Sequence, residues 1–288
     1  MKLNIPFNLK YIEIDGYNIA TQLLGEGENL IVLLHGGGIL SPIMEFKAIS
    51  ELLAQNFKVL VIECFGYGLS DSINKERTIE NITDEIHRVI STYQFKKYII
   101  IGHSIAGVYS LFYTNKYPEE VIAFIGIDTS VPKQNEYLNL QFLNVFAARV
   151  TRFLRKSKLQ SILAKKETMF LPKINTVSWT EDEILLFKEL YVNKSANDTV
   201  LNELQNSTRN FNLSNNMLFP IEIPVLFFLS AQSCKQIKAW EELHYNILQE
   251  HTRSKIVVYE GNHFLHYSHP KEIVTEIRTW LSHPFPQM

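Results

Sequence analysis

The sequence has few cysteines, and none of them lies in a pattern that binds metal or builds a disulfide framework. Its 288 residues include two cysteines, Cys64 and Cys234, which excludes the disulfide-rich scaffolds of small secreted domains. No Cys/His pair has the spacing of zinc ligands, so we expect neither a metal nor a cofactor. A reducing, cytoplasmic location fits this usage best.

Long apolar runs and a strong net charge are also absent. No run approaches the roughly eighteen apolar residues that a membrane-spanning helix needs, and residues 1–10 lack the apolar core and cleavage site of a secretory signal. The formal net charge of −2 provides no global field that would attract nucleic acid. We therefore expect no transmembrane segment and no nucleic-acid partner.

The most informative stretch that is present covers residues 98–107, with the sequence YIIIGHSIAG. Its continuous apolar run predicts a strand covered on both faces, as in a parallel sheet. The run ends at Ser104, which has Gly102 two residues before it and Ala106 two residues after it. Small residues at these positions permit a sharp turn from strand to helix, and Gly-x-Ser-x-Gly is the nucleophile elbow of serine hydrolases.

Two further motifs flank this stretch in the chain. A glycine-rich loop, His35–Gly38, follows the apolar run at 30–34, and Gly261-Asn262-His263 follows a short apolar run near the C-terminus. With these motifs in this order, the chain resembles the α/β-hydrolase family over nearly its whole length except the middle third. The resemblance implies an α/β fold, with a mostly parallel central sheet flanked by helices and a helical cap inserted after the sixth strand. The implied division is a core of residues 1–130 and 221–288 and a cap of residues 131–220.

Local patterns predict the remaining elements of the core. Asp15-Gly16 favours a type I′ turn, which predicts a hairpin of residues 9–14 and 17–24. Ser41-Pro42 is typical of a helix start, and we expect that helix to reach about residue 55. Further strands are predicted at 58–62, 121–127, 223–229 and 255–259, and further helices at 78–93, 104–116, 236–250 and 270–281. The turn at residues 63–70 resembles the family's Asp-x-Arg-Gly-x-Gly-x-Ser, with Glu63 and Phe65 in place of Asp and Arg, and we interpret it as structural.

The middle of the chain shows helical patterns only. Residues 138–166 place apolar side chains at helical spacing among Arg and Lys residues, which predicts a cap helix with a solvated basic face. The alternative is attraction of that face to an anionic lipid surface or an anionic substrate. A capping box at Thr180–Glu183 predicts another helix, and the asparagine-rich residues 202–216 predict a loose return to the core.

A serine nucleophile needs a base to accept its proton and a group that orients the base. Among nine histidines, His263 lies in the turn where the family carries its base. The resemblance implies that Ser104 is the nucleophile and that the backbone N–H groups of Gly37 and Ile105 form the oxyanion hole.

The acid of the triad departs from the family pattern. Ser233 occupies the position where family members usually carry Asp, and the next carboxylate is Glu241. Asp128, at the end of the preceding core strand, is the best substitute, because some branches of the family place the acid there. The alternatives are a Ser-His dyad without an acid and a Glu of the cap or of a late helix.

These residues predict a serine hydrolase that cleaves an ester or related acyl bond of a small, apolar substrate. Two alternatives stay open. The same triad could hydrolyse a carbon–carbon bond or a peptide, or the protein could bind a ligand for signalling with weak or vestigial hydrolysis. Ser104 replaces the Asp nucleophile that would have indicated a dehalogenase.

Overall fold

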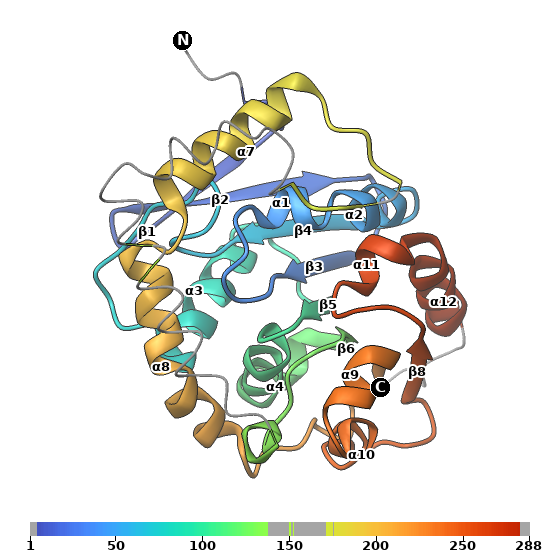
Figure 1. Ribbon diagram of the computed structural model, residues 1–288. Coiled ribbons are helices and arrows are strands. Elements are labelled where there is room, and N and C mark those ends of the chain that lie inside the picture. Colours follow the sequence, from blue (N-terminus) through green and yellow to red (C-terminus); the bar gives the residue numbers. More distant parts are fainter. Residues whose placement is uncertain (1–4, 138–149, 151, 153–170, 175, 283–288) are drawn as a thin grey trace.

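A computed structural model describes residues 5–137, 150, 152, 171–174 and 176–282, and its centre is one eight-stranded sheet (Figure 1). The strand order is β1-β2-β4-β3-β5-β6-β7-β8, with β1 and β2 antiparallel to their neighbours and all later pairs parallel. The strands are β1 Lys10–Ile14, β2 Tyr17–Leu24, β3 Leu30–Leu34, β4 Lys58–Glu63, β5 Tyr98–His103, β6 Val121–Ile127, β7 Val225–Ser230 and β8 Lys255–Tyr259. The predicted α/β class and mostly parallel sheet are confirmed.

The antiparallel edge begins with the predicted hairpin. Asp15 and Gly16 both have positive φ, at 56° and 82°, which is the backbone conformation that a type I′ turn requires at its two central residues. The turn pairs Ile14 with Tyr17. The Asp-Gly prediction is therefore confirmed at the level of backbone angles.

The central strands are apolar throughout because helices cover both faces of the sheet. Alternate residues of β5 enter different cores: Ile100 packs with α3 (Ile79–Ser91) and α4 (Ala106–Lys116), whereas Ile99 and Ile101 pack with α2 (Lys47–Leu53) and α12 (Pro270–Ser282) (Figure 1). All six residues of β5 are buried. The sheet therefore holds the C-terminal ends of β3, β5 and β6 in fixed positions side by side.

Two predicted helices are interrupted. The helix predicted from residue 41 to 55 is split into α1 (Pro42–Glu45) and α2 by Phe46, which has φ −87° and ψ 3°. The helix predicted at 236–250 is replaced by α9 (Ala231–Gln236) and α10 (Trp240–Tyr245), and the junction contains Ala239 at a left-handed φ of 67°. The break allows Trp240 to turn inward, where its indole reaches a carboxylate described below.

The predicted loose return at residues 202–216 is wrong, because α8 (Asp198–Ser214) is a helix capped by Asn197. Its asparagines bond to the core instead of interrupting the helix. Asn210 accepts from the Ile79 amide and donates to the Arg77 carbonyl, and Asn202 accepts from the Arg77 amide. Tertiary hydrogen bonds thus override the low helix propensity of Asn.

The segment between β6 and β7 contains α7 (Glu181–Lys194) as well as α8. The capping box of Thr180 and Glu183 is present at the start of α7. The basic helix predicted at 138–166 lies outside the described residues, apart from positions 150 and 152. Among the helices of the described chain, none is both long enough and apolar enough to cross a bilayer.

Candidate active site

Ser104 occupies a strained turn at the C-terminal end of β5. Its φ is 55°, in the left-handed region that a non-glycine residue adopts at an energetic cost. Two amides hold the turn, because the Ser104 carbonyl accepts from Gly107 at 3.0 Å and from Ser130 at 2.8 Å. The turn leaves the Ser104 side chain facing a cavity of about 370 Å³, as a nucleophile elbow does.

The small residues around this elbow are not equally constrained. A Cβ added to Gly107 would lie 2.4 Å from the Ser130 carbonyl oxygen and 2.5 Å from Thr129 Cβ, both in the loop after β6. A Cβ on Gly102 would find its nearest neighbours at 3.3 and 3.4 Å. Gly107 is therefore the residue that lets helix α4 approach the neighbouring loop most closely.

We expect Gly107→Ala to lower the free energy of unfolding by about 1–3 kcal/mol, because the added methyl group overpacks this contact. Gly102→Ala is the matched control and should cost less, since its neighbours need to move only a few tenths of an ångström. Urea unfolding of both variants measures the difference. Equal stability of the two variants would contradict this account of the elbow.

Asp128 lies at the end of β6 and is fully buried. Its carboxylate accepts hydrogen bonds from a ring of donors: Ser230 N and Trp240 Nε1 to Oδ1, and Ser230 Oγ, Ser233 Oγ and His263 Nδ1 to Oδ2. A buried carboxylate is stable only when it is bonded in this way. The arrangement holds Asp128 ionised in the protein interior.

His263 Nδ1–H donates to Asp128 Oδ2 at 2.9 Å. This bond fixes the tautomer, so Nε2 is the basic nitrogen, and His263 lines the same cavity as Ser104. Burial alone would raise the pKa of Asp128, but hydrogen bonding and the charge of His263, with the Ser230 and Ser233 donors, lower that pKa to about 2. Asp128 can therefore orient His263 as a base and stabilise the imidazolium that forms when His263 accepts a proton.

The lowered pKa of Asp128 predicts a specific loss of stability in acid. Because the folded pKa of about 2 lies below the unfolded value of 3.8, the ionised carboxylate stabilises the fold above about pH 4. That contribution, about 2 kcal/mol, is lost as the pH falls toward 2. We expect urea unfolding between about pH 5 and pH 2 to show this extra loss in the wild type and not in Asp128→Asn. Parallel acid profiles of the two proteins would contradict it.

Ser233, at the position where the family usually carries the acid, contacts Asp128. Its hydroxyl donates to Asp128 Oδ2 at 2.6 Å and lies 2.9 Å from Ser230 Oγ. The sequence predicted this departure and the substitute carboxylate, and the structure brings Asp128, Ser233 and His263 together. The sequence does not indicate the hydrogen bond from Trp240 to Asp128, because a tryptophan in a predicted helix carries no signal of such a contact.

Gly37 and Ile105 line the cavity that contains Ser104. Within the described residues, neither backbone amide donates a hydrogen bond to another group, so both are available to an oxygen atom in the cavity. Buried His35 supports the glycine loop, since its Nδ1 lies 2.8 Å from the Gly36 carbonyl and its Nε2 accepts from the Cys64 amide. Tyr67 accepts from the Gly38 amide at 3.2 Å.

Glu203 of α8 lines the cavity that contains Ser104. Its sequence pattern does not indicate this position, because it lies in the segment predicted to be a loop. Its carboxylate accepts from Tyr67 and Tyr109 hydroxyls at 3.0 and 2.9 Å. Since Tyr67 also holds the glycine loop, these bonds connect α8 to the loop that carries Gly37. Glu63 holds the turn at 63–70, because its carboxylate accepts from the Ser41 hydroxyl and from the Leu69 amide.

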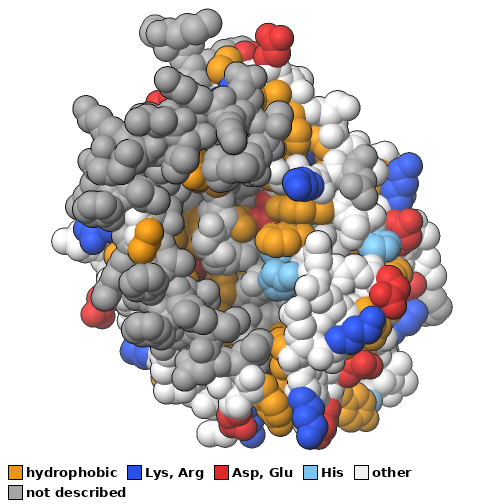
Figure 2. Space-filling view, viewed as in Figure 1, with side chains coloured by type: hydrophobic (Ala, Val, Ile, Leu, Met, Phe, Trp, Pro, Cys, Tyr) orange, Lys and Arg blue, Asp and Glu red, His pale blue; other side chains and the backbone are white. Residues whose placement is uncertain are grey.

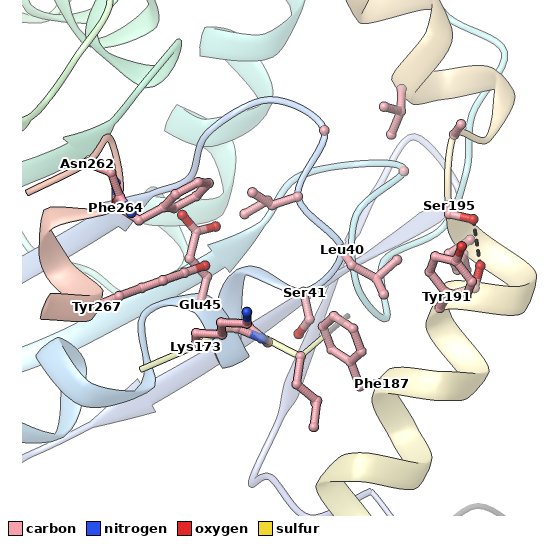
Figure 3. A pocket seen from close by; sticks show the side chains of 18 of the residues that line it. Leu40, Ser41, Glu45, Lys173, Phe187, Tyr191, Ser195, Asn262, Phe264 and Tyr267 are labelled. Carbon is pink, nitrogen blue, oxygen red and sulfur yellow. Dashed lines mark hydrogen bonds between the residues drawn. The ribbon is translucent and has the colours of Figure 1, made fainter. Parts of the chain in front are cut away.

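A second and larger cavity, of about 880 Å³, adjoins the first, and Leu204 lines both. Its wall is mainly apolar, with Leu40, Phe187, Phe264 and Tyr267 among the side chains that face it (Figure 3). Among the described residues that line it, Lys173 and Lys194 carry a positive charge. Figure 2 shows the hollow on this face of the molecule, with hydrophobic side chains and a histidine exposed at its edge.

Comparison with known proteins identifies the family of the fold. A model of the alpha/beta hydrolase fold family matches residues 29–270. The uncharacterized protein YbdG of Bacillus subtilis is 26% identical over 217 residues, 75% of this chain and 66% of that protein. The 2-hydroxy-6-oxononadienedioate/2-hydroxy-6-oxononatrienedioate hydrolase of Escherichia coli K12 is 30% identical over 100 residues, 34% of this chain and 35% of the enzyme. The chain thus spans less than two thirds of the length of these relatives.

Solved structures share the fold at low sequence identity. A putative epoxide hydrolase from Pseudomonas aeruginosa superimposes with a TM-score of 0.76 at 13% identity, covering 98% of this chain and 97% of that one. Cfl2 from Burkholderia cenocepacia superimposes with a TM-score of 0.74 at 15% identity, covering 94% and 95%. At these identities the likeness concerns the fold alone.

Proposed function

The chain belongs to the alpha/beta hydrolase fold family, and we propose that it is a serine hydrolase that cleaves an ester or related acyl bond of a small substrate. The observation that carries the proposal is the 2.9 Å contact between His263 and buried Asp128 in the wall of the cavity that contains Ser104. A serine at a strained elbow, a histidine of defined tautomer and a buried carboxylate are the parts of a catalytic triad.

The proposed reaction proceeds in two steps. Ser104 Oγ attacks the carbonyl carbon while His263 Nε2 accepts the hydroxyl proton, and the amides of Gly37 and Ile105 stabilise the oxyanion. His263 then returns the proton to the leaving alcohol, which departs and leaves an acyl group on Ser104. Water, deprotonated by His263, attacks the acyl carbon of that acyl-enzyme. The bond to Ser104 Oγ breaks, His263 returns the proton to Oγ, and the carboxylic acid leaves; Asp128 stabilises the imidazolium in both steps.

The two cavities support a substrate with two unequal parts. The smaller cavity holds the reacting groups, and the larger one, with its mainly apolar wall, has room for an apolar portion. We also propose that residues 131–220 act as a cap, because α7 supplies Phe187 and α8 supplies Leu204 to these walls.

Rates of ester hydrolysis test this proposal. We expect p-nitrophenyl butanoate to be a good substrate and the anionic p-nitrophenyl succinate a poorer one, measured as kcat/KM. A preference for the anion would overturn the apolar assignment and point to Lys173 or Lys194. Absence of hydrolysis for the whole ester series, with folded protein, would overturn the esterase proposal and favour a ligand-binding protein.

The second candidate is hydrolysis of a carbon–carbon bond on the same residues. It is favoured by the 30% identity, over 100 residues, to the Escherichia coli hydrolase named for 2-hydroxy-6-oxononadienedioate and 2-hydroxy-6-oxononatrienedioate. A vinylogous 1,5-diketone acid tests it spectrophotometrically. Faster cleavage of this compound than of any p-nitrophenyl ester would replace the esterase proposal.

A further inference from the structure

A buried cluster of one carboxylate and two imidazoles lies behind the proposed active site. Glu45 ends α1, His103 ends β5, and His266 belongs to α11 (Leu265–Ser268). Each of the three residues is at most 2% exposed. Glu45 Oε1 lies 2.8 Å from His103 Nδ1 and 3.2 Å from His266 Nε2. None of these side chains takes part in the proposed catalytic steps.

The short contact between His103 and ionised Glu45 requires a proton or a metal cation between the two atoms. His103 Nε2 lies 3.2 Å from the backbone carbonyl oxygen of His263. A carbonyl only accepts hydrogen bonds, so Nε2 carries the proton, and Nδ1 of the neutral ring presents a lone pair. That lone pair faces a carboxylate oxygen at 2.8 Å. Two electron-rich atoms at this distance repel each other unless a proton or a metal cation lies between them.

Hydrogen bonds to other groups do not satisfy the polar atoms of this cluster. Within the described residues, both oxygens of Glu45, Nδ1 of His103 and both ring nitrogens of His266 are buried without a hydrogen-bond partner of acceptable geometry. Orphaned polar atoms of this kind are costly in a protein interior.

We propose that Glu45, His103 and His266 form a binding site for a divalent transition-metal ion of the zinc type. Two imidazole nitrogens and one carboxylate oxygen, with one position left open, are a zinc ligand set. Ligand atoms at 2.0–2.2 Å from a tetrahedral ion stand roughly 3.3 Å apart. Here Glu45 Oε1 lies 2.8 and 3.2 Å from the two nitrogens, and the three ligand atoms are within 4.8 Å of one another. The bond from His103 Nε2–H to a backbone carbonyl is the outer contact that metal-binding histidines make.

The position of the cluster provides a role for the ion. Glu45 also lines the larger cavity, where Figure 3 shows it beside Phe264 and Tyr267, so the cluster lies next to that cavity. The ligands come from three separate elements. An ion would join the strand that ends beside Ser104 to the segment that carries His263, and so position both. The spacing of cysteines and histidines could not indicate this site, because its ligands are distant in the chain.

Metal binding by the untagged protein tests the proposal without measuring hydrolysis. After dialysis against a chelator, we expect one equivalent of Zn²⁺ or Co²⁺ to bind, with a visible d–d absorption for Co²⁺ and a rise in Tm. His266→Ala and Glu45→Gln should each lose the absorption and the Tm shift. His269→Ala is the matched control: its Nδ1 pairs with Ser268 Oγ at 2.8 Å outside the cluster, and it should bind as the wild type does.

A protein that binds neither ion, with no absorption and no Tm shift, would overturn the proposal and leave a proton shared by Glu45 and His103 as the missing charge. X-ray absorption of the cobalt-loaded wild type counts the imidazole ligands and remains decisive even if a variant fails to fold. Two imidazoles support the site, and fewer than two overturn it.

Discussion

Ser104→Ala is expected to abolish labelling by a fluorophosphonate and to reduce ester hydrolysis by about a million-fold. The reason is that Ser104 Oγ is the atom of the proposed triad that forms a covalent bond to the substrate. The turn itself, held by the Gly107 and Ser130 amides, does not depend on the side chain. Gel fluorescence and initial rates with p-nitrophenyl butanoate measure the two effects.

Ser110→Ala is the matched control for this experiment. Ser110 is a fully buried serine on α4, the helix that follows the elbow, and it does not line the cavity that contains Ser104. We expect this variant to be labelled as the wild type is. Labelling that persists in Ser104→Ala would show that another serine is the nucleophile and would refute the proposed mechanism.

Asp128→Asn is expected to lower kcat by about four orders of magnitude with little change in KM. The asparagine is nearly the same size, but its amide cannot stabilise the imidazolium of His263 as an anion does. It also presents an N–H group in place of an acceptor, which favours the wrong tautomer of His263. Steady-state kinetics at a single pH near neutrality measures the loss.

The double variant Asp128→Asn/Ser233→Asp provides a further test of the acid. Ser233 Oγ already lies 2.6 Å from Asp128 Oδ2, so a carboxylate at position 233 enters the same hydrogen-bond network. We expect it to recover part of the lost kcat. If Asp128→Asn alone keeps its activity within tenfold of the wild type, a Ser-His dyad or another carboxylate is the better description.

The strands could be predicted because their pattern reflects a local property, burial on both faces. The apolar runs at residues 30–34 and 121–127 predict β3 and β6 with their observed ends. The Asp15-Gly16 pair predicts a turn because these residue types tolerate positive φ. The helices were less accurate. Propensity predicted a loop where α8 lies, because it could not include the bonds that Asn202 and Asn210 make to a distant part of the chain.

The sequence by itself determined the order and chemical type of the proposed catalytic groups: a serine between small residues, a glycine loop before it and a histidine after the last strand. Only the tertiary structure decided which carboxylate meets His263, because Asp128 and Ser233 follow two neighbouring strands, β6 and β7, that are far apart in the chain. The same reason applies to Glu45, His103 and His266. Local patterns report burial and turn geometry, whereas contacts between buried polar groups depend on how the strands and helices pack together.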